Sequence, residues 1–136
     1  MFKYFLTFFS LFVVDRLTKL YILKKSSLLE GDFLQFYLNR DIAFSIPVLN
    51  FILWPLLILI LVFLIFWWQK TYQKQEIVSW PLALIIIGAF SNILDRLIYG
   101  GVIDFINLPY WPIFNLSDSY ITIGVFCLII FELKKK

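Results

Sequence analysis

The segment "PIFNLSDSYITIGVFCLIIFELKKK" (Pro112–Lys136) contains an apolar run long enough to cross a bilayer, with one aspartate, Asp118, near its start. A carboxylate at the centre of a membrane helix costs about 2.5–3.5 kcal/mol on insertion scales. Such a cost predicts that the acid is used inside the protein and does not face lipid.

Three further apolar runs precede this segment. The chain of 136 residues is 62% hydrophobic with a mean hydropathy of +0.89, whereas soluble domains are about half apolar. Since about 20 apolar residues span a bilayer, the runs predict spans at about Phe2–Leu23, Val48–Trp68, Ile77–Ile98 and Ile113–Leu133. We therefore expect an all-α integral membrane protein, one four-helix bundle domain over residues 1–136, with loops at about 24–47 and 99–112.

Lysine and arginine residues predict the orientation, because they are enriched in cytoplasmic loops. With a cytoplasmic N-terminus, the inner side carries Lys3, Lys70, Lys74, Lys134, Lys135 and Lys136. The outer side carries only Lys24, Lys25 and Arg40. We expect both termini in the cytoplasm and the first run retained as a helix. This bias explains the net charge of +3 without a nucleic-acid partner.

The polar residues of three runs gather at one depth, toward the predicted outer face. They form three pairs at helical spacing, namely Asp15 with Lys19, Asn92 with Arg96, and Asn115 with Asp118. Structural ion pairs would explain any one of them, and Asp95 beside Arg96 could be a local charge balance. The common depth of the whole set favours a functional site in the bundle interior.

The predicted loop 99–112 contributes one more acid, Asp104, with apolar residues on both sides. We expect this loop to lie against the membrane surface. Only 13 residues separate Asp104 from Asp118, so a return loop can bring the two carboxyl groups face to face.

The chain has no histidine and a single cysteine, Cys127. Histidine-based triads and zinc motifs are thereby excluded, and carboxylate chemistry remains. Two aspartates in one site share a proton, so one can activate water while the other protonates a carbonyl oxygen. The same pair could bind a hard cation, or Asp15, Asp95 or Asp118 could relay protons in a small proton-coupled transporter.

Five short motifs follow one another along the chain. They are "DRLTK" (Asp15–Lys19), "NRDIAFS" (Asn39–Ser45), "GAFSNILDR" (Gly88–Arg96), "VIDF" (Val102–Phe105) and "FNLSD" (Phe114–Asp118). With these motifs in this order, the chain resembles the lipoprotein signal peptidases (signal peptidase II), four-helix bacterial membrane aspartic peptidases. The resemblance covers essentially the whole length.

The resemblance implies that Asp104 and Asp118 are the catalytic pair. It further implies that four residues line the pocket and hold substrate or orient the pair: Asn39, Asn92, Arg96 and Asn115. Asp15 and Lys19 would support the site from the first helix. A small extracytoplasmic β-cradle is expected over about Ser26–Ile46, with "DFLQFYL" as a strand.

The family's substrates are prolipoproteins whose cysteine carries a diacylglyceryl group, and cleavage falls on the N-terminal side of that cysteine. The resemblance thus implies membrane lipid and prolipoproteins as partners, with no metal, cofactor or nucleic acid. We expect a monomer in the bacterial cytoplasmic (inner) membrane, with its active site at the outer face.

Four positions depart from the family pattern. Glycine is usual where this chain has Asp41, Ser45 and Ser91, and alanine is usual at Ser117. These residues add side chains where backbones pack or bend, while the two candidate catalytic aspartates are unchanged. An inactive member that keeps only the binding pocket is therefore a further alternative.

Overall fold

The computed structural model describes residues 2–26, 31, 33–41, 49–74 and 76–134. Helices and strands follow in the order α1 (Phe2–Lys25), β1 (Leu34–Asn39), α2 (Asn50–Gln73), α3 (Ser79–Tyr99), β2 (Val102–Ile106) and α4 (Leu116–Leu133). Each predicted membrane span corresponds to one helix. The protein is a mostly helical membrane protein with a small two-stranded sheet, as the sequence predicts.

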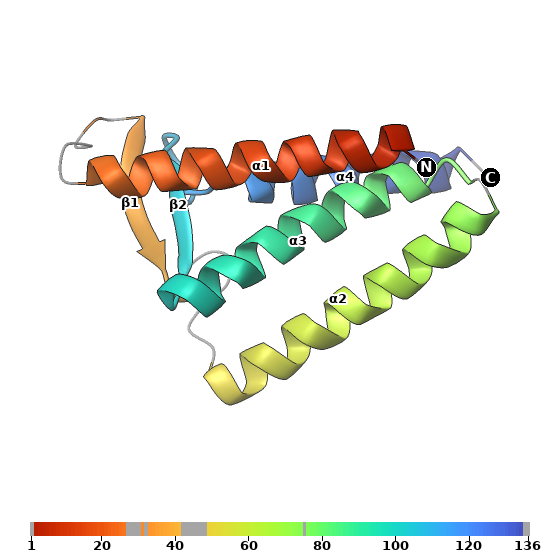
Figure 1. Cartoon of the computed structure of the whole chain (residues 1–136), viewed down its shortest axis with the longest axis horizontal. Helices are drawn as coiled ribbons and strands as arrows, with labels where there is room; N and C mark the ends of the chain where they lie inside the picture. The colour runs from red at the N-terminus through yellow and green to blue at the C-terminus, as the bar shows by residue number, and fades with distance from the viewer. Residues whose placement is uncertain (1, 27–30, 32, 42–48, 75, 135–136) are drawn as a thin grey trace.

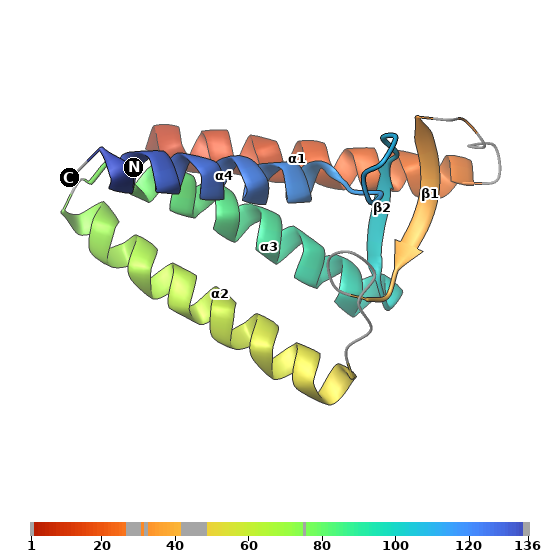
Figure 2. The same ribbon diagram turned by 180° about the vertical axis from the view of Figure 1, so that it is seen from behind.

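Helix α3 packs against both α1 and α4, and the sheet crosses one end of this three-helix group (Figure 1). Helix α2 meets α3 at the opposite end and diverges from it toward the sheet, as both views show (Figure 2). The first turn of α1 and the last turn of α4 lie together at the end away from the sheet. Both ends of the helical chain are thus on one side of the bundle.

Three helices, α2, α3 and α4, are long and apolar enough to cross a membrane. Helix α1 has 24 residues but carries Asp15, Arg16 and Lys19 within it. The side chains of Asp15 and Lys19 are completely buried. The charged residues lower the hydropathy of α1, but Asp15 and Lys19 are enclosed within the protein.

Close packing between α3 and α4 depends on glycine. A Cβ atom at Gly88 would lie inside van der Waals contact with the backbone oxygen of Ser117, and one at Gly124 would collide with α3 at Pro81 and Ile85. Small residues let membrane helices approach to backbone contact. Gly88 therefore brings α3 directly against the first turn of α4.

Substituting Gly88→Ala should lower the free energy of unfolding by about 1–3 kcal/mol, because the added methyl group forces α3 and α4 apart. Denaturant unfolding in detergent, followed by tryptophan fluorescence, measures this loss. Gly31→Ala is the matched control, since the nearest atom to its new Cβ would be Leu34 O at 3.7 Å, an ordinary contact. Equal stability of the two variants would contradict this packing.

Strands β1 and β2 pair antiparallel, with Tyr37 opposite Asp104 and Leu38 opposite Ile103. Successive side chains of a strand point to opposite faces. Ile103 and Phe105 are buried against Ile22 of α1, which leaves Asp104 on the other face. The alternation in "VIDFI" thus places an acid opposite a hydrophobic core.

The predicted loop 99–112 is not irregular throughout. Residues Val102–Ile106 form a strand, and the apolar neighbours of Asp104, Ile103 and Phe105, are buried in the core. The strand predicted from "DFLQFYL" is present as β1, whose bounds are Leu34–Asn39. The remainder of the expected cradle, at 27–30, 32 and 42–48 with Ser45, lies outside the described residues.

Helix α4 begins at Leu116, later than the predicted Ile113, because Asn115 caps it. The Asn115 side chain accepts a hydrogen bond from the backbone of Asp118, and the Asp118 side chain accepts one from the backbone of Asn115. This reciprocal capping box satisfies two N–H groups at a helix start. Before it, Phe114 continues the sheet through backbone hydrogen bonds to Ile106.

Candidate active site

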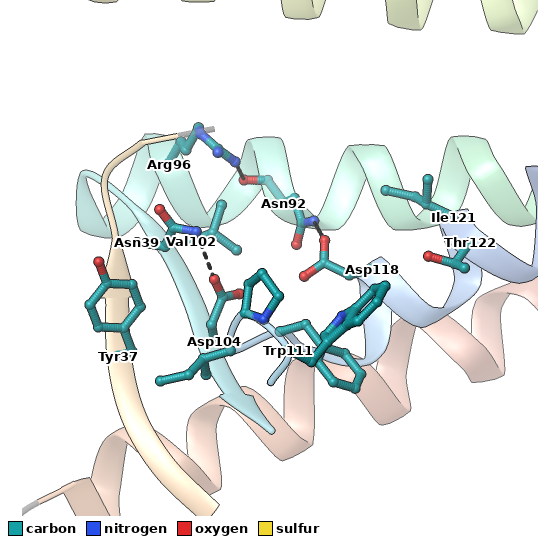
Figure 3. A pocket seen from close by; sticks show the side chains of 13 residues that line it. Tyr37, Asn39, Asn92, Arg96, Val102, Asp104, Trp111, Asp118, Ile121 and Thr122 are labelled. Carbon is teal, nitrogen blue, oxygen red and sulfur yellow. Dashed lines mark hydrogen bonds between the residues drawn. The ribbon is translucent and has the colours of Figure 1, made fainter. Parts of the chain in front are cut away.

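A cavity of about 430 Å³ lies where the sheet meets α3 and α4 (Figure 3). Its lining includes five residues predicted for the site, namely Asn39, Asn92, Arg96, Asp104 and Asp118. Figure 3 shows the carboxyl groups of Asp104 and Asp118 directed into this space from β2 and α4. The sequence prediction that the polar residues converge is confirmed.

Asp104 reaches the cavity because it lies on the face of β2 opposite the core, and it is only 2% exposed. Asn39 Nδ2 of β1 donates to its Oδ2 at 2.9 Å. Asn115 Nδ2 donates to its Oδ1 at 2.7 Å. Both carboxyl oxygens are therefore held by side-chain amides from two different segments.

Asp118 lies in the first turn of α4, where the helix N-terminus favours a negative charge. Asn92 Nδ2 of α3 donates to its Oδ1 at 2.7 Å, and the backbone N–H of Asn115 donates to its Oδ2 at 3.2 Å. Asn115 thus contacts the carboxyl groups of both Asp104 and Asp118. One residue links the two acids.

The pKa of Asp104 is raised to about 7. Burial is the main cause, and the charge of Asp118 adds to it. Hydrogen bonds from Asn39 and Asn115 and the nearby charge of Lys19 act in the opposite direction but do not cancel the increase. Asp104 is therefore positioned to hold a proton near neutral pH.

The orientation of the Asn92 amide is determined by its other contacts. Its Oδ1 accepts hydrogen bonds from Lys19 Nζ at 3.1 Å and from Asn115 Nδ2 at 3.2 Å. Both neighbours are donors, so the NH₂ group of Asn92 must face Asp118. Lys19 does not line the cavity. By binding Asn92 Oδ1, however, it directs the NH₂ group of Asn92 toward Asp118.

Arg96 holds the end of β1 through backbone atoms. Its guanidinium donates to the backbone oxygen of Asp41 at 2.8 Å, and the backbone N–H of Asp41 donates to Asn39 Oδ1 at 3.1 Å. Both contacts use only the main chain at position 41. The departure from glycine at Asp41 therefore leaves these contacts intact.

Behind the cavity lies a group of four charged residues, Asp15, Arg16, Lys19 and Asp95, called here the buried ion cluster. Lys19 Nζ lies 3.1 Å from Asp15 Oδ2 and 2.7 Å from Asp95 Oδ2, and Arg16 contacts Asp95 Oδ1 at 2.5 Å. The predicted pairing of Asp15 with Lys19 is confirmed. Asp95 forms its described ion pairs with Arg16 and Lys19 and not with its neighbour Arg96, on which its charge still acts.

Ser91 and Ser117, the two other described departures from the family pattern, contact this cluster. Ser91 Oγ donates to Asp15 Oδ2 at 2.5 Å, and Ser117 Oγ accepts from Lys19 Nζ at 3.4 Å. Both serines are fully buried. Their hydroxyl groups therefore add hydrogen bonds to the buried ion cluster instead of being left unsatisfied.

Sequence reasoning missed two parts of the site. Asp95 and Arg16 belong to the buried ion cluster, and their only sequence signal was charge within apolar runs. The wall of the cavity beyond the five polar residues was also missed; it includes Tyr37, Val102, Trp111, Pro112, Ile113, Phe114, Ile121 and Thr122. Period-two alternation along β1 could have identified Tyr37, which lies on the same strand face as Asn39.

Chemically, the cavity presents two acids that share a hydrogen-bonding residue, one of them with a pKa near neutrality. A proton relay through a transporter would instead require acids spread across the membrane depth. Among the residues that the structure describes, Asp15, Asp95, Asp104 and Asp118 all belong to one connected network at the sheet end. This arrangement suits acid–base hydrolysis.

The sequence model of the family "Signal peptidase (SPase) II" matches residues 7–134. The lipoprotein signal peptidase of Pelagibacter ubique (strain HTCC1062) is 40% identical, over 90% of this chain and 82% of its own length. That of Syntrophomonas wolfei is 35% identical, over 93% of this chain and 90% of its own length.

Solved structures give the same result at the level of the fold. A bacterial membrane enzyme determined at 2.3 Å resolution superimposes with a TM-score of 0.86 at 28% sequence identity, over 98% of this chain and 89% of that one. The family match, the curated relatives and the shared fold all extend over nearly the whole chain. The chain therefore belongs to the lipoprotein signal peptidases, the signal peptidase II family of membrane aspartic peptidases.

Proposed function

We propose that Asp104 and Asp118 are the catalytic pair, and that they cleave a diacylglyceryl-modified prolipoprotein on the N-terminal side of its lipidated cysteine. The observation that carries this assignment is that both carboxyl groups line one cavity and contact the same residue, Asn115. Two acids held in this way can share a single proton. The chemistry needs neither a metal nor a cofactor.

In the resting enzyme we assign the proton to Asp104. Its pKa of about 7 leaves it half protonated at neutral pH and mostly protonated below it. Asp118 is then the ionised partner, because the N-terminus of α4 and two N–H donors stabilise its negative charge. The two acids thus differ in their roles because they differ in their surroundings.

In the first step a water molecule between the acids attacks the carbonyl carbon of the scissile peptide bond. Asp118 takes a proton from the water molecule while the oxygen of that water forms the new bond to the carbonyl carbon. Asp104 donates its proton to the carbonyl oxygen. The product is a neutral tetrahedral diol, with the proton of the pair now on Asp118.

In the second step the bond between carbon and nitrogen breaks. Asp118 donates its proton to the departing nitrogen, and Asp104 takes a proton back from one hydroxyl group of the diol. The products are the carboxylic acid of the signal peptide and the free amine of the lipidated cysteine. Each aspartate returns to its starting protonation state, so the cycle consumes one water molecule.

The amide and guanidinium groups around the pair have supporting roles in this proposal. Asn39, Asn92 and Asn115 orient the two carboxyl groups, and Arg96 fixes the end of β1 beside them. Asp15 and Lys19 support the site from α1. The exposed wall residue Trp111 and its apolar neighbours are suited to contact the lipid-modified substrate.

The proposed setting is the bacterial cytoplasmic membrane, with α1 as the fourth span and the chain acting as a monomeric, single membrane-embedded domain. Both termini face the cytoplasm and the sheet faces outward, in keeping with the lysine distribution and with the shared location of the two helical ends. A lipid-anchored cysteine lies at the outer interface of the bilayer. The scissile bond would thus be presented at the depth of Asp104 and Asp118.

The purified protein in detergent should process a diacylglyceryl-modified prolipoprotein, which a gel-shift assay detects as loss of the signal peptide. The same prolipoprotein without its diacylglyceryl group is the matched control and should be cleaved far more slowly. Equal cleavage of both substrates would contradict the proposed specificity. No cleavage of either by folded protein would favour a member that only binds substrate.

The pH dependence follows from the pKa of Asp104. This acid must be protonated at the start of the cycle, so kcat/KM should fall as pH rises above about 7, approaching about tenfold per pH unit. In Asn39→Leu the amide donor that favours the ionised form of Asp104 is lost. The pKa of Asp104 should rise, and the alkaline limb should move to higher pH.

The matched control is Asn50→Leu at an exposed position in α2, which should leave the alkaline limb near pH 7. The test depends on the pH at which the alkaline limb falls and not on the maximal rate, because Asn39→Leu also lowers the maximal rate. An unchanged limb in Asn39→Leu, or one shifted to lower pH, would argue against Asp104 as the proton donor.

A further inference from the structure

Two carboxylates of the buried ion cluster, Asp15 and Asp95, share a property that neither helix spacing nor charge pairing explains. Asp15 Oδ1 accepts the backbone N–H of Ser117 at 3.0 Å. Asp95 Oδ2 accepts the backbone N–H of Ile103 at 3.3 Å. In each case the donor is the residue immediately before a member of the proposed catalytic pair.

Lys19 connects these two contacts. Its ammonium group lies 3.1 Å from Asp15 Oδ2 and 2.7 Å from Asp95 Oδ2, and all three side chains are completely buried. A continuous path of polar contacts therefore runs from the backbone of β2, through Asp95, Lys19 and Asp15, to the first turn of α4. It joins the two segments on which the catalytic acids lie.

Such a path is suited to fix geometry. Buried ion pairs operate at low dielectric and are expensive to break, so they hold their partners firmly. Catalytic groups must be held within about 0.5 Å of their productive positions. A displacement of about 1 Å caused by a distant substitution can cost about 100-fold in rate.

We propose that Asp95 is a positioning residue for the peptidase reaction, matched with Asp15, and that the two, bridged by Lys19, set the placement of Asp104 relative to Asp118. This inference rests on the proposed catalytic pair. Asp95 does not line the cavity, so it acts through β2 and Lys19 and not by contact with substrate. Its effect should appear in kcat and not in KM.

The competing explanation is that Asp95 only balances charge. The buried ion cluster contains two acids and two bases, and Asp95 contacts both bases. A test must therefore separate the negative charge from the hydrogen-bond acceptor. Arg16→Met supplies the background, because a neutral residue at position 95 then leaves Asp15 and Lys19 as a balanced pair.

In this background, Asp95→Asn and Asp95→Leu are both neutral and similar in size. The asparagine oxygen can still accept the N–H of Ile103, whereas leucine cannot. We expect kcat of the leucine variant to be about 100-fold below that of the asparagine variant, with KM equal within about threefold. Rates are taken per folded molecule isolated by size exclusion.

The pH profile provides the second readout. The charged groups that face Asp104 are Asp118 of α4, Lys19 of α1 and Arg96 of α3. Its amide donors are Asn39 and Asn115, and all five residues are the same in both variants. A strand released from Asp95 would move Asp104 away from burial and from Asp118, the two causes that raise its pKa. The alkaline limb of the leucine variant should therefore lie at lower pH.

Thr71→Val is the control for loss of a buried hydrogen-bonding group. Thr71 is 5% exposed in α2, and among the described residues its hydroxyl group bonds to backbone oxygens of its own helix, so kcat and the pH profile should match those of the starting protein. Equal kcat of the two Asp95 variants, a difference confined to KM, or an unshifted alkaline limb would each overturn the proposal.

If Asp95→Leu does not fold, Asp95→Ala replaces it in the same background. Should neither fold while Asp95→Asn does, the acceptor is needed for folding and the positioning role is rejected. Failure of the catalytic assignment would look different, because Asp104→Asn would then retain cleavage whatever residue occupies position 95.

Discussion

Substituting Asp118→Asn or Asp104→Asn should lower kcat for prolipoprotein cleavage by about 1,000-fold or more in each case, because either change removes one of the two proton-transfer groups. Asparagine preserves the size of each side chain and one carbonyl acceptor. Asp104→Asn also removes an acid that is only 2% exposed and whose ionisation burial opposes. Both variants should therefore remain folded in the membrane.

Single-turnover cleavage, with each variant at equal folded concentration, measures this effect. Because the two acids act as one unit, the double variant should be no slower than the slower single variant. Asp41→Asn is the matched control, since only backbone atoms of Asp41 contact Asn39 and Arg96. Retention of full activity by either Asp104→Asn or Asp118→Asn would reject the catalytic assignment.

Substituting Lys19→Met should cause the largest loss of stability, about 3–5 kcal/mol, because it leaves buried carboxylates without their shared cation. Asp15 and Asp95 are both 0% exposed, and only Arg16 would remain to balance them. The orientation of Asn92 would also be lost, since Lys19 is one of its two donors. Denaturant unfolding in detergent measures the change in free energy.

Lys24→Met is the control for removing a lysine from the same helix, and it should change stability by less than about 0.5 kcal/mol because Lys24 is exposed. A second substitution, which neutralises one of the buried acids, makes the test more specific. Adding Asp15→Asn to Lys19→Met restores charge balance with Arg16 and Asp95, and should recover part of the lost stability. Strictly additive losses would contradict the buried ion cluster as a single electrostatic unit.

Much of the fold could be predicted because membrane spans are long and uniform. The predictions that failed concern elements whose limits depend on particular hydrogen bonds. The start of α4 is set by the reciprocal hydrogen bonds of Asn115 and Asp118, and the spacing of these two residues is itself a capping-box signal. Strand β2 was missed because its five residues form a strand only by pairing with β1, which no local pattern specifies.

The site divides in the same way. Asn92, Asn115 and Asp118 could be placed together because polar groups in membrane helices must face the protein interior. Asp104 was added from the short return loop, and Asn39 from the family resemblance. The partners of Asp95 could not be predicted, since Arg16 and Lys19 lie on another helix and only tertiary packing brings them near. Likewise, the serines at positions 91 and 117 acquire their role from contacts with Asp15 and Lys19.

Single-turnover cleavage in water labelled with heavy oxygen tests most directly whether these two acids hydrolyse the peptide bond by activating water. The carboxyl group of every signal peptide released in the first turnover should carry one labelled oxygen, and no peptide should become covalently attached to the enzyme. A first-turnover product without label, or an adduct trapped on Asp104 or Asp118, would show that a carboxylate attacks the substrate itself and would contradict the mechanism.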